Sequence, residues 1–186
     1  MQTDEDRDRR LEALERRVRV LEDELAIREL LVSYGFAADS GDGPGTAALY
    51  TTDSSTVIDH TLVFDGAAGI LDLIADPGHQ AIIPGSAHVM GPFSISVDGD
   101  TAVAVGYATT FTRTEGEVRV WRQSVNRWDC VRERDGATSA WRIARRDSRA
   151  LIDPSASEHF RVGLDRPEHG RPWPPPVAPT PSEDVQ

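Results

Sequence analysis

Two residues in the first half of the sequence have side chains that together could move a proton. His88 lies in SAHVMGPFSISVDGD, directly before an alternating apolar and polar run, with no charged residue within several positions. Asp39 lies near the end of an apolar helical pattern, one turn after Gly35 and Phe36. An imidazole can act as a general base near neutral pH, and a neighbouring carboxylate orients it. If the fold brings them together, the two residues predict a His–Asp pair for proton abstraction.

Each of these residues also has a purely structural interpretation. Asp39 could be a helix-end carboxylate that faces water, and a lone His beside a strand is more often structural than catalytic. If Asp39 points inward, it needs a partner, because burial of an unpaired carboxylate raises its pKa. Only the catalytic interpretation requires the two side chains to meet.

A long amphipathic helix must carry Asp39, because its apolar pattern ends at Gly41 and Gly43. Its first part has an a/d seam of apolar residues at spacings of 3 and 4, namely Leu11, Leu14, Val18, Leu21 and Leu25. The seam spans about two heptads, fewer than a secure coiled coil needs. Two alternatives therefore stay open: self-association through the seam, or a helix that lies on its own domain.

The rest of the chain predicts an α+β fold. We expect short helices at 44–50 and 67–76, and short strands at 55–60 and 61–66. Four longer strands at about 87–97, 101–114, 117–133 and 138–152 are joined by turns that contain Asp-Gly or Glu-Gly. Such connections make an antiparallel meander, which we expect to curve over the N-terminal helices. The predicted organisation is a helical extension (1–24), one α+β domain (25–153) and a Pro-rich tail (154–186) that cannot form a core.

Composition excludes several classes of function. The net charge is −11 and the pI is about 4.8, which disfavours nucleic acid and anionic membranes as partners. All 20 basic residues are Arg, so a Schiff-base lysine and a Walker A lysine are both excluded. Cys130 is the only cysteine, and a cytoplasmic location is therefore expected. His60, His79 and Asp59 match no standard metal spacing, so no metal site is predicted, while His159 and His169 are expected to be solvated.

Three segments of the sequence resemble the NTF2-like (SnoaL-like) α+β cone family. They are IRELLVSYGFAADSGD, SAHVMGPFSISVDGDTAVAVGYATTF and NRWDCVRERDGATSAWRIARRD, and the resemblance covers about residues 22–152. The most similar branch holds scytalone dehydratase and lindane dehydrochlorinase. This resemblance implies a curved sheet around a small-molecule cavity, with His88 as the base and Asp39 as its orienting carboxylate.

The resemblance also implies further site residues. Arg146, after Trp141, matches or adjoins the arginine of the dehydrochlorinase. Tyr34 replaces the pocket lysine of that enzyme, which argues against chloride as the leaving group and offers a phenol that can polarise a carbonyl. From strand alternation we expect Asn126 and Trp128 to face the cavity. Further aromatic candidates for its wall, each equally suited to ordinary packing, are Tyr107, Phe111 and Trp121.

These observations predict a cofactor-independent lyase or isomerase, dehydratase-like or cyclase-like, acting on a small, mostly apolar carbonyl compound. One alternative is a non-catalytic ligand-binding or assembly module of the same fold. A lower-ranked alternative is an epoxide hydrolase, for which the expected Asp–Arg–Asp set cannot be assembled from the sequence. The resemblance further implies a homo-oligomer, a trimer or a dimer, and no metal.

Overall fold

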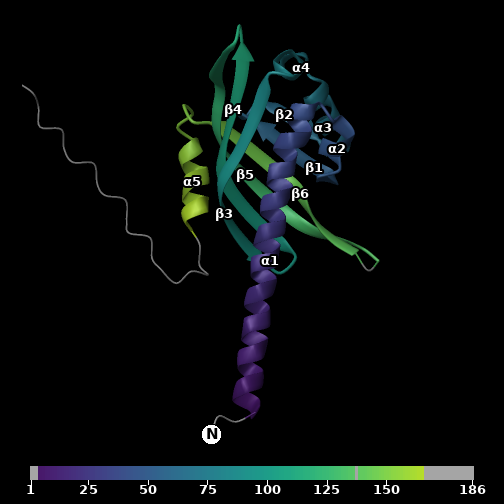
Figure 1. Cartoon of the computed structure of the whole chain (residues 1–186), viewed down its shortest axis with the longest axis vertical. Helices are drawn as coiled ribbons and strands as arrows, with labels where there is room; N and C mark the ends of the chain where they lie inside the picture. The colour runs from purple at the N-terminus through teal and green to yellow at the C-terminus, as the bar shows by residue number, and fades with distance from the viewer. Residues whose placement is uncertain (1–3, 137, 166–186) are drawn as a thin grey trace, which may run out of the picture.

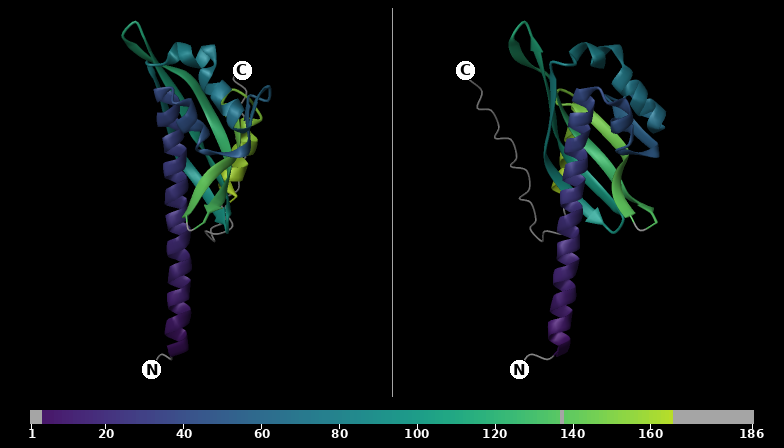
Figure 2. Two further views of the ribbon diagram at one scale, coloured as in Figure 1. Left: turned by 90° about the vertical axis from the view of Figure 1, so that its right-hand side faces the viewer. Right: turned by 45° about the vertical axis from the view of Figure 1, so that its right-hand side comes forward.

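The computed structural model describes residues 4–136 and 138–165, which form one curved sheet with helices on both faces (Figures 1 and 2). The long helix α1 (Asp4–Ser40) runs along one side of the sheet. The acidic residues Asp4, Glu5 and Asp6 occupy its first turn, where they interact favourably with the helix dipole. The chain leaves the helix at Gly41, whose φ of 70° suits glycine.

The sheet has six strands in the order β2-β1-β6-β5-β4-β3. Their bounds are β1 (Tyr50–Ile58), β2 (Leu62–Asp65), β3 (Ser86–Asp98), β4 (Thr101–Thr114), β5 (Glu117–Asp135) and β6 (Thr138–Ala150). Only the β1–β6 pairing is parallel, and the other four are antiparallel. The predicted α+β class is therefore confirmed, the four-strand meander follows the expected order, and the parallel β1–β6 pair makes the sheet mixed.

Three short helices cover the end of the sheet near the C-terminal end of α1: α2 (Gly43–Ala47), α3 (Gly66–Ala75) and α4 (Pro77–Ile82). The helix expected at 67–76 corresponds to α3, whereas α4 was not predicted. Pro77 occupies the start of α4, where its missing N–H costs nothing. Asp76 caps this helix by accepting hydrogen bonds from the backbone N–H groups of Gly78 and His79.

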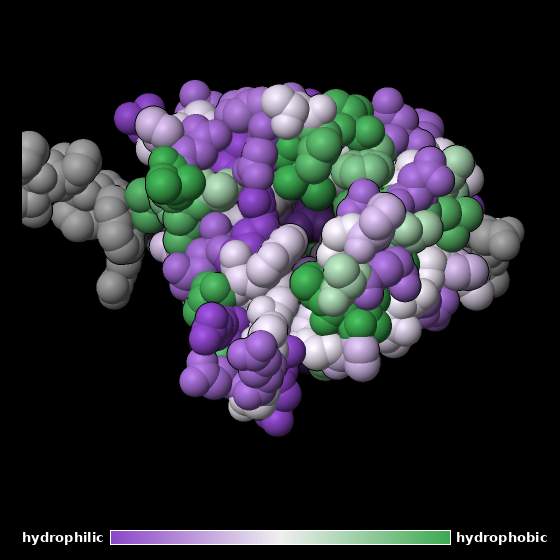
Figure 3. Space-filling model, turned by 90° about the horizontal axis from the view of Figure 1, so that it is seen from above, coloured by the Kyte–Doolittle hydropathy of each residue, from purple (hydrophilic) through white to green (hydrophobic). Residues whose placement is uncertain are grey.

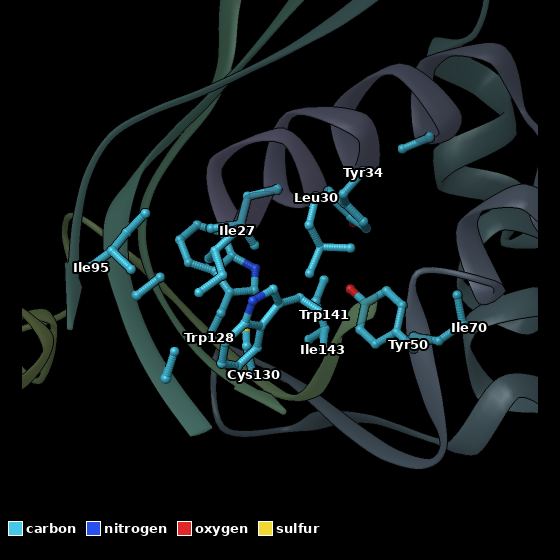
Figure 4. Close-up of a cluster of buried hydrophobic side chains, with 14 of the residues drawn as sticks. Ile27, Leu30, Tyr34, Tyr50, Ile70, Ile95, Trp128, Cys130, Trp141 and Ile143 are labelled. Atoms are coloured by element: carbon cyan, nitrogen blue, oxygen red, sulfur yellow. The ribbon is translucent and has the colours of Figure 1, made fainter. Parts of the chain in front are cut away.

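The main core lies between α1 and the sheet (Figure 4). Ile27 and Leu31 from α1 are fully buried, as are Trp128 from β5 and Ile143 from β6. Cys130 belongs to the same cluster, and burial raises the pKa of its thiol to about 12. This cysteine is therefore an unreactive core residue rather than a nucleophile.

The opposite face of the sheet is covered by α5 (Ala156–Leu164). Ala156 packs with Val105 and Val125, and Phe160 contacts Tyr107 with 5.7 Å between ring centroids. This helix lies inside segment 154–186, which the sequence analysis assigned to the tail, so ordered packing continues past residue 154. The proline-rich part of that segment and His169 lie outside the described residues. Within the described residues, no helix is both long and apolar enough to cross a membrane.

Candidate active site

Asp39 and His88 meet where the last turn of α1 crosses the start of β3. Asp39 Oδ1 accepts a hydrogen bond from His88 Nδ1 at 2.7 Å, and Oδ2 accepts one from the His88 backbone N–H at 2.6 Å. Ser86 Oγ donates a third hydrogen bond to Oδ1 at 2.8 Å. The carboxylate thus fixes both the backbone and the ring of His88, and it leaves Nε2 as the ring nitrogen available to a ligand.

A glycine permits this close approach of helix and strand. A Cβ atom on Gly35 would lie 2.7 Å from the carbonyl oxygen of His88 and 3.2 Å from the Met90 side chain. Any larger residue at position 35 would push β3 away from α1. In the motif SYGFAAD, Gly35 must therefore be small so that β3 can approach α1, and this approach positions Asp39 one turn later.

The electrostatics of the pair favour a neutral imidazole beside an ionised carboxylate. Burial lowers the pKa of His88, and although Asp39 opposes this effect, the pKa stays below its ordinary value. Burial alone would raise the pKa of Asp39, but the hydrogen bonds from His88 and Ser86 outweigh it and hold that pKa below its usual range. At neutral pH, His88 is therefore in the form that accepts a proton.

His88 borders a cavity of about 340 Å³ beside α3 and α4. Figure 3 looks onto this end of the molecule and shows a hollow with hydrophilic residues at its base and hydrophobic residues around it. The lining side chains with polar or charged groups are Tyr34, Asp59, Asp76, His79, His88, Thr110, Arg122, Ser124, Arg146 and Ser148. The apolar part of the wall comes from Ile58, Leu62, Phe64, Leu73, Ile74 and Trp121. The cavity suits a small, mainly apolar molecule with a few polar atoms.

Arg146 places a buried positive charge against this cavity. It is 6% exposed, its Nε donates to Asn126 Oδ1 at 3.0 Å, and its NH1 donates to the Tyr34 hydroxyl. The guanidinium carbon lies 4.5 Å from the centre of the Tyr34 ring. Among the described residues, no carboxylate forms a salt bridge with Arg146, and its guanidinium contacts the neutral side chains of Asn126 and Tyr34. Such a site is built to receive an anionic or strongly polarised oxygen.

A second charged group stands at the cavity wall. Arg122 donates two hydrogen bonds to Asp59, at 2.7 and 2.9 Å, and Asp59 also accepts from the backbone N–H of Ala150. The Arg122 hydrogen bonds are the main reason that the pKa of Asp59 is lowered. Unlike Arg146, Arg122 therefore has its charge compensated within the chain.

Only some of the residues predicted to form the cavity wall line the cavity. Trp121 lines the cavity, but Trp128 is fully buried in the main core, where it contacts Phe93 edge-on with 5.7 Å between ring centroids. Asn126 shares the inner face of β5 as expected, yet it lies behind Arg146 as a hydrogen-bond partner and does not line the cavity. Alternation gives the face of a side chain but not its depth, because the bulk of α1 fills part of the concave surface.

Two predicted wall residues lie elsewhere. Tyr107 points to the opposite face of the sheet, where it packs on α5, because its neighbour Ala108 occupies the cavity side. Phe111 follows an irregularity between Thr110 and itself in the β4–β5 pairing and is not among the residues that line the cavity.

The histidines outside the pair have three different surroundings. His60 contacts Asp153 at 2.9 Å, whereas His79 lies in the cavity with its ring 5.8 Å from that of His88. In the described part of the chain, no group of three or more potential ligands gathers to hold a metal. The expectation that His159 is solvated is wrong: it is 6% exposed on α5 and lies 3.5 Å from Asp147.

Sequence reasoning missed the contribution of α4 and its flanks to the cavity. His79 and Asp76 both line it, and the segment DPGHQ contains the N-cap and Pro that begin a helix. That signal was present in the sequence. The polar lining by Thr110, Ser124 and Ser148 depends on strand register across three strands, which no local pattern specifies.

Comparisons with known proteins agree with this architecture. Residues 19–147 match the family described as "SnoaL-like domain". An NTF2-like protein with a cystatin-like fold from Novosphingobium aromaticivorans is 35% identical, with a TM-score of 0.73 over 79% of this chain and 94% of that chain. A candidate scytalone dehydratase from the same organism is 18% identical, with a TM-score of 0.60 over 71% of this chain and 86% of that chain.

A more distant structure, from Catenulispora acidiphila, was solved in complex with S-DNPA. It is 17% identical, with a TM-score of 0.61 over 70% of this chain and 94% of that chain. The search of curated proteins gave no match.

Proposed function

The chain belongs to the SnoaL-like family, and from this premise we propose that it is a cofactor-independent lyase or isomerase that removes a proton next to a carbonyl group. The observation that carries the proposal is the 2.7 Å contact between Asp39 and His88 at the wall of a cavity. A general base must be accessible to its substrate and neutral at working pH; His88 lines the cavity, and its lowered pKa favours the neutral imidazole, which supports this role.

Arg146 and Tyr34 supply the second half of this chemistry. Removal of a proton next to a carbonyl places negative charge on the carbonyl oxygen. Within residues 4–136 and 138–165, the buried guanidinium of Arg146 has no carboxylate partner, so an enolate oxygen would provide an anionic contact. The Tyr34 hydroxyl, which accepts a hydrogen bond from Arg146, retains its own proton to donate.

We place β-elimination of water first among the reactions that these groups support. His88 Nε2 accepts the proton from the carbon next to the carbonyl, and the electron pair is held as the enolate. The enolate then re-forms the carbonyl, creates a carbon–carbon double bond and expels the β-hydroxyl group. The imidazolium returns its proton to the departing oxygen, so one water leaves and His88 is neutral again. A double-bond shift or a cyclisation would use the same first step.

The alternative functions receive less support from the site. An assembly module would be expected to have a filled cone, whereas this sheet encloses a cavity of about 340 Å³. The epoxide hydrolase alternative needs two carboxylates around one arginine at the cavity, and among the described residues Arg122 pairs there with Asp59 alone. Arg132 does lie between Asp23 and Asp100, but none of these three residues lines this cavity. A non-catalytic binder of small molecules remains the competing function, because it would use the same cavity.

Hydrogen exchange into substrate candidates separates enzyme from binder. We would incubate the protein in D₂O with a panel of cyclic ketones and β-hydroxyketones and follow loss of the α-proton signal by NMR. An enzyme should accelerate exchange or elimination, and His88→Gln should reduce the rate by about 10²–10⁴-fold without loss of binding. Saturable binding with no proton exchange in the wild type would instead identify a binder.

A further inference from the structure

The N-terminal half of α1 carries an apolar seam that its own domain does not cover. Leu11, Leu14, Val18, Leu21 and Leu25 are each between 51% and 63% exposed. The first residue of α1 that is buried is Glu24, so the preceding part of the helix extends beyond the sheet (Figures 1 and 2). Five exposed large aliphatic residues on one stripe are far more than isolated surface hydrophobics, and they indicate an interface.

The seam faces away from the domain along the whole helix. Phe36, which is 72% exposed, lies about five turns after Val18 and so on the same side of α1. Ile27, which is fully buried, lies about two and a half turns after Val18 and so on the opposite side. A second helix could therefore pack along the seam while the two domains stay on the outer sides of the helix pair.

The charges that flank the seam select the orientation of this partner. With Leu11, Val18 and Leu25 at a positions, Arg10 and Arg17 fall at g, whereas Glu15 and Glu22 fall at e. In a parallel pair, each g residue faces the e residue of the next heptad in the other helix, which matches Arg10 with Glu15 and Arg17 with Glu22. In an antiparallel pair with Leu11 opposite Leu21, g faces g and e faces e, so Arg17 would meet Arg17 and Glu15 would meet Glu15. Arg10 would then face Glu24, but that carboxylate is buried against its own domain and paired with Arg28.

From these observations, we propose that two copies of this chain associate through Leu11–Leu25 as a parallel, in-register, two-stranded coiled coil. Val18 at the central a position between Leu14 and Leu21 at d is the arrangement that favours two strands. The i,i+4 salt bridges Arg16–Glu12 and Arg19–Glu15 stabilise the helix in the single chain. Where the seam region meets the domain, Asp23 attaches α1 to the sheet by accepting hydrogen bonds from Trp141 and Arg132.

Sedimentation of the full chain and of charge variants tests this surface. The wild type should sediment as a dimer, and Arg10→Glu/Arg17→Glu should shift it toward monomer. Mixing that variant with Glu15→Arg/Glu22→Arg should restore dimers. The matched control is Arg9→Glu/Arg16→Glu, which makes the same change in net charge on the side away from the seam and should leave the dimer intact. A monomeric or trimeric wild type, or a dimer that survives Leu14→Asp/Leu21→Asp, would overturn the proposal.

Cysteine cross-linking tests the orientation, and the single native cysteine, Cys130, is buried and gives little background. Leu11→Cys should form a disulfide with its own copy under mild oxidation, because the two positions are adjacent only in a parallel pair. In an antiparallel pair, they would lie about 10 residues, or roughly 15 Å, apart along the axis. Peptide mapping that finds cross-links only between Leu11→Cys and Leu21→Cys chains in a mixture would establish the antiparallel arrangement and refute the parallel one.

Discussion

Asp39 accepts hydrogen bonds from both the ring and the backbone of His88, a residue 49 positions further along the chain. The two contacts use different carboxylate oxygens, so rotation of either side chain would break one of them. This double attachment explains how a helix end can fix the direction of an imidazole on a separate strand. It also couples the protonation of the two residues, so a change at Asp39 should be detectable as a change in the pKa of His88.

Removal of the Asp39 charge should lower the pKa of His88. Burial already lowers that pKa, and the Asp39 carboxylate is the main group that opposes the effect. In Asp39→Asn the opposition is lost, so NMR titration should place the His88 transition at a lower pH than in the wild type. An unchanged transition would show that the two residues are not electrostatically coupled. Asp53→Asn, an exposed carboxylate on β1, serves as the control and should leave His88 unaffected.

The rate of proton abstraction should fall as the solution becomes acidic. His88 must be neutral to act as a base, and its pKa lies below the ordinary 6.5. We therefore expect kcat/KM to be constant near neutral pH and to decrease tenfold per pH unit below the pKa of His88. A profile measured with an exchange substrate that remained flat through this range would exclude His88 as the base.

The free energy of unfolding should also decrease as the pH falls. Because the pKa of His88 is lower in the folded than in the unfolded state, the unfolded state binds more protons, and stability is lost as the pH falls through 6.5. The pKa of Asp39 is also lower in the folded state, so its contribution is present above 3.8 and is lost on further acidification. Urea midpoints should decrease between pH 7 and 3, and His88→Gln should remove the part of that decrease that begins as the pH falls through 6.5.

Arg146 should contribute to the reaction rather than only to stability. Arg146→Met retains much of the side-chain volume but removes the donors that would face an enolate oxygen. We expect a loss of about 10²–10³-fold in kcat with a folded protein. Arg146→Lys is a useful second variant, because it keeps the positive charge but lacks the planar guanidinium that donates to both Asn126 and the Tyr34 hydroxyl. Equal activity in Arg146→Met and the wild type would assign the residue a structural role.

The sequence was sufficient to predict the four-strand meander and the helix that carries Asp39, because the Asp-Gly and Glu-Gly turns and the helical period are strong local signals. It did not predict the parallel pairing of β1 with β6. The meeting of Asp39 with His88 was a hypothesis that the family resemblance favoured, because no local pattern specifies a contact between residues 49 positions apart. The depth of individual side chains was less accessible. Trp128 and Asn126 have the predicted face, but Trp128 lies in the solid core because α1 residues such as Ile27 fill the space above it.

The regions predicted less well are those whose structure depends on tertiary contacts. His159 was expected to be solvated because its segment precedes a proline-rich run, yet α5 buries it against the outer face of the sheet. The helix is amphipathic, but its apolar positions are few, and it is held there by packing on Val105 and Val125, by the Phe160–Tyr107 contact and by the hydrogen bond from Ser94 to the Gly163 carbonyl oxygen. A short amphipathic helix gains most of its stability from such packing, so its own sequence is a weak predictor.

Gly35→Ala should separate the packing requirement at the helix–strand crossing from the chemistry of the pair. The added methyl group would lie 2.7 Å from the backbone oxygen of His88, which cannot move without shifting β3. Overpacking of this kind costs about 1–3 kcal/mol, which exceeds the roughly 1 kcal/mol that alanine gains over glycine in a helix. We expect a lower urea midpoint and a weaker Asp39–His88 contact, visible as a shifted His88 titration. Ser33→Ala, on the exposed side of α1, should leave both quantities near the wild-type values. A Gly35→Ala protein as stable as the wild type would show that β3 can retreat freely, and that the pair is held by its hydrogen bonds alone.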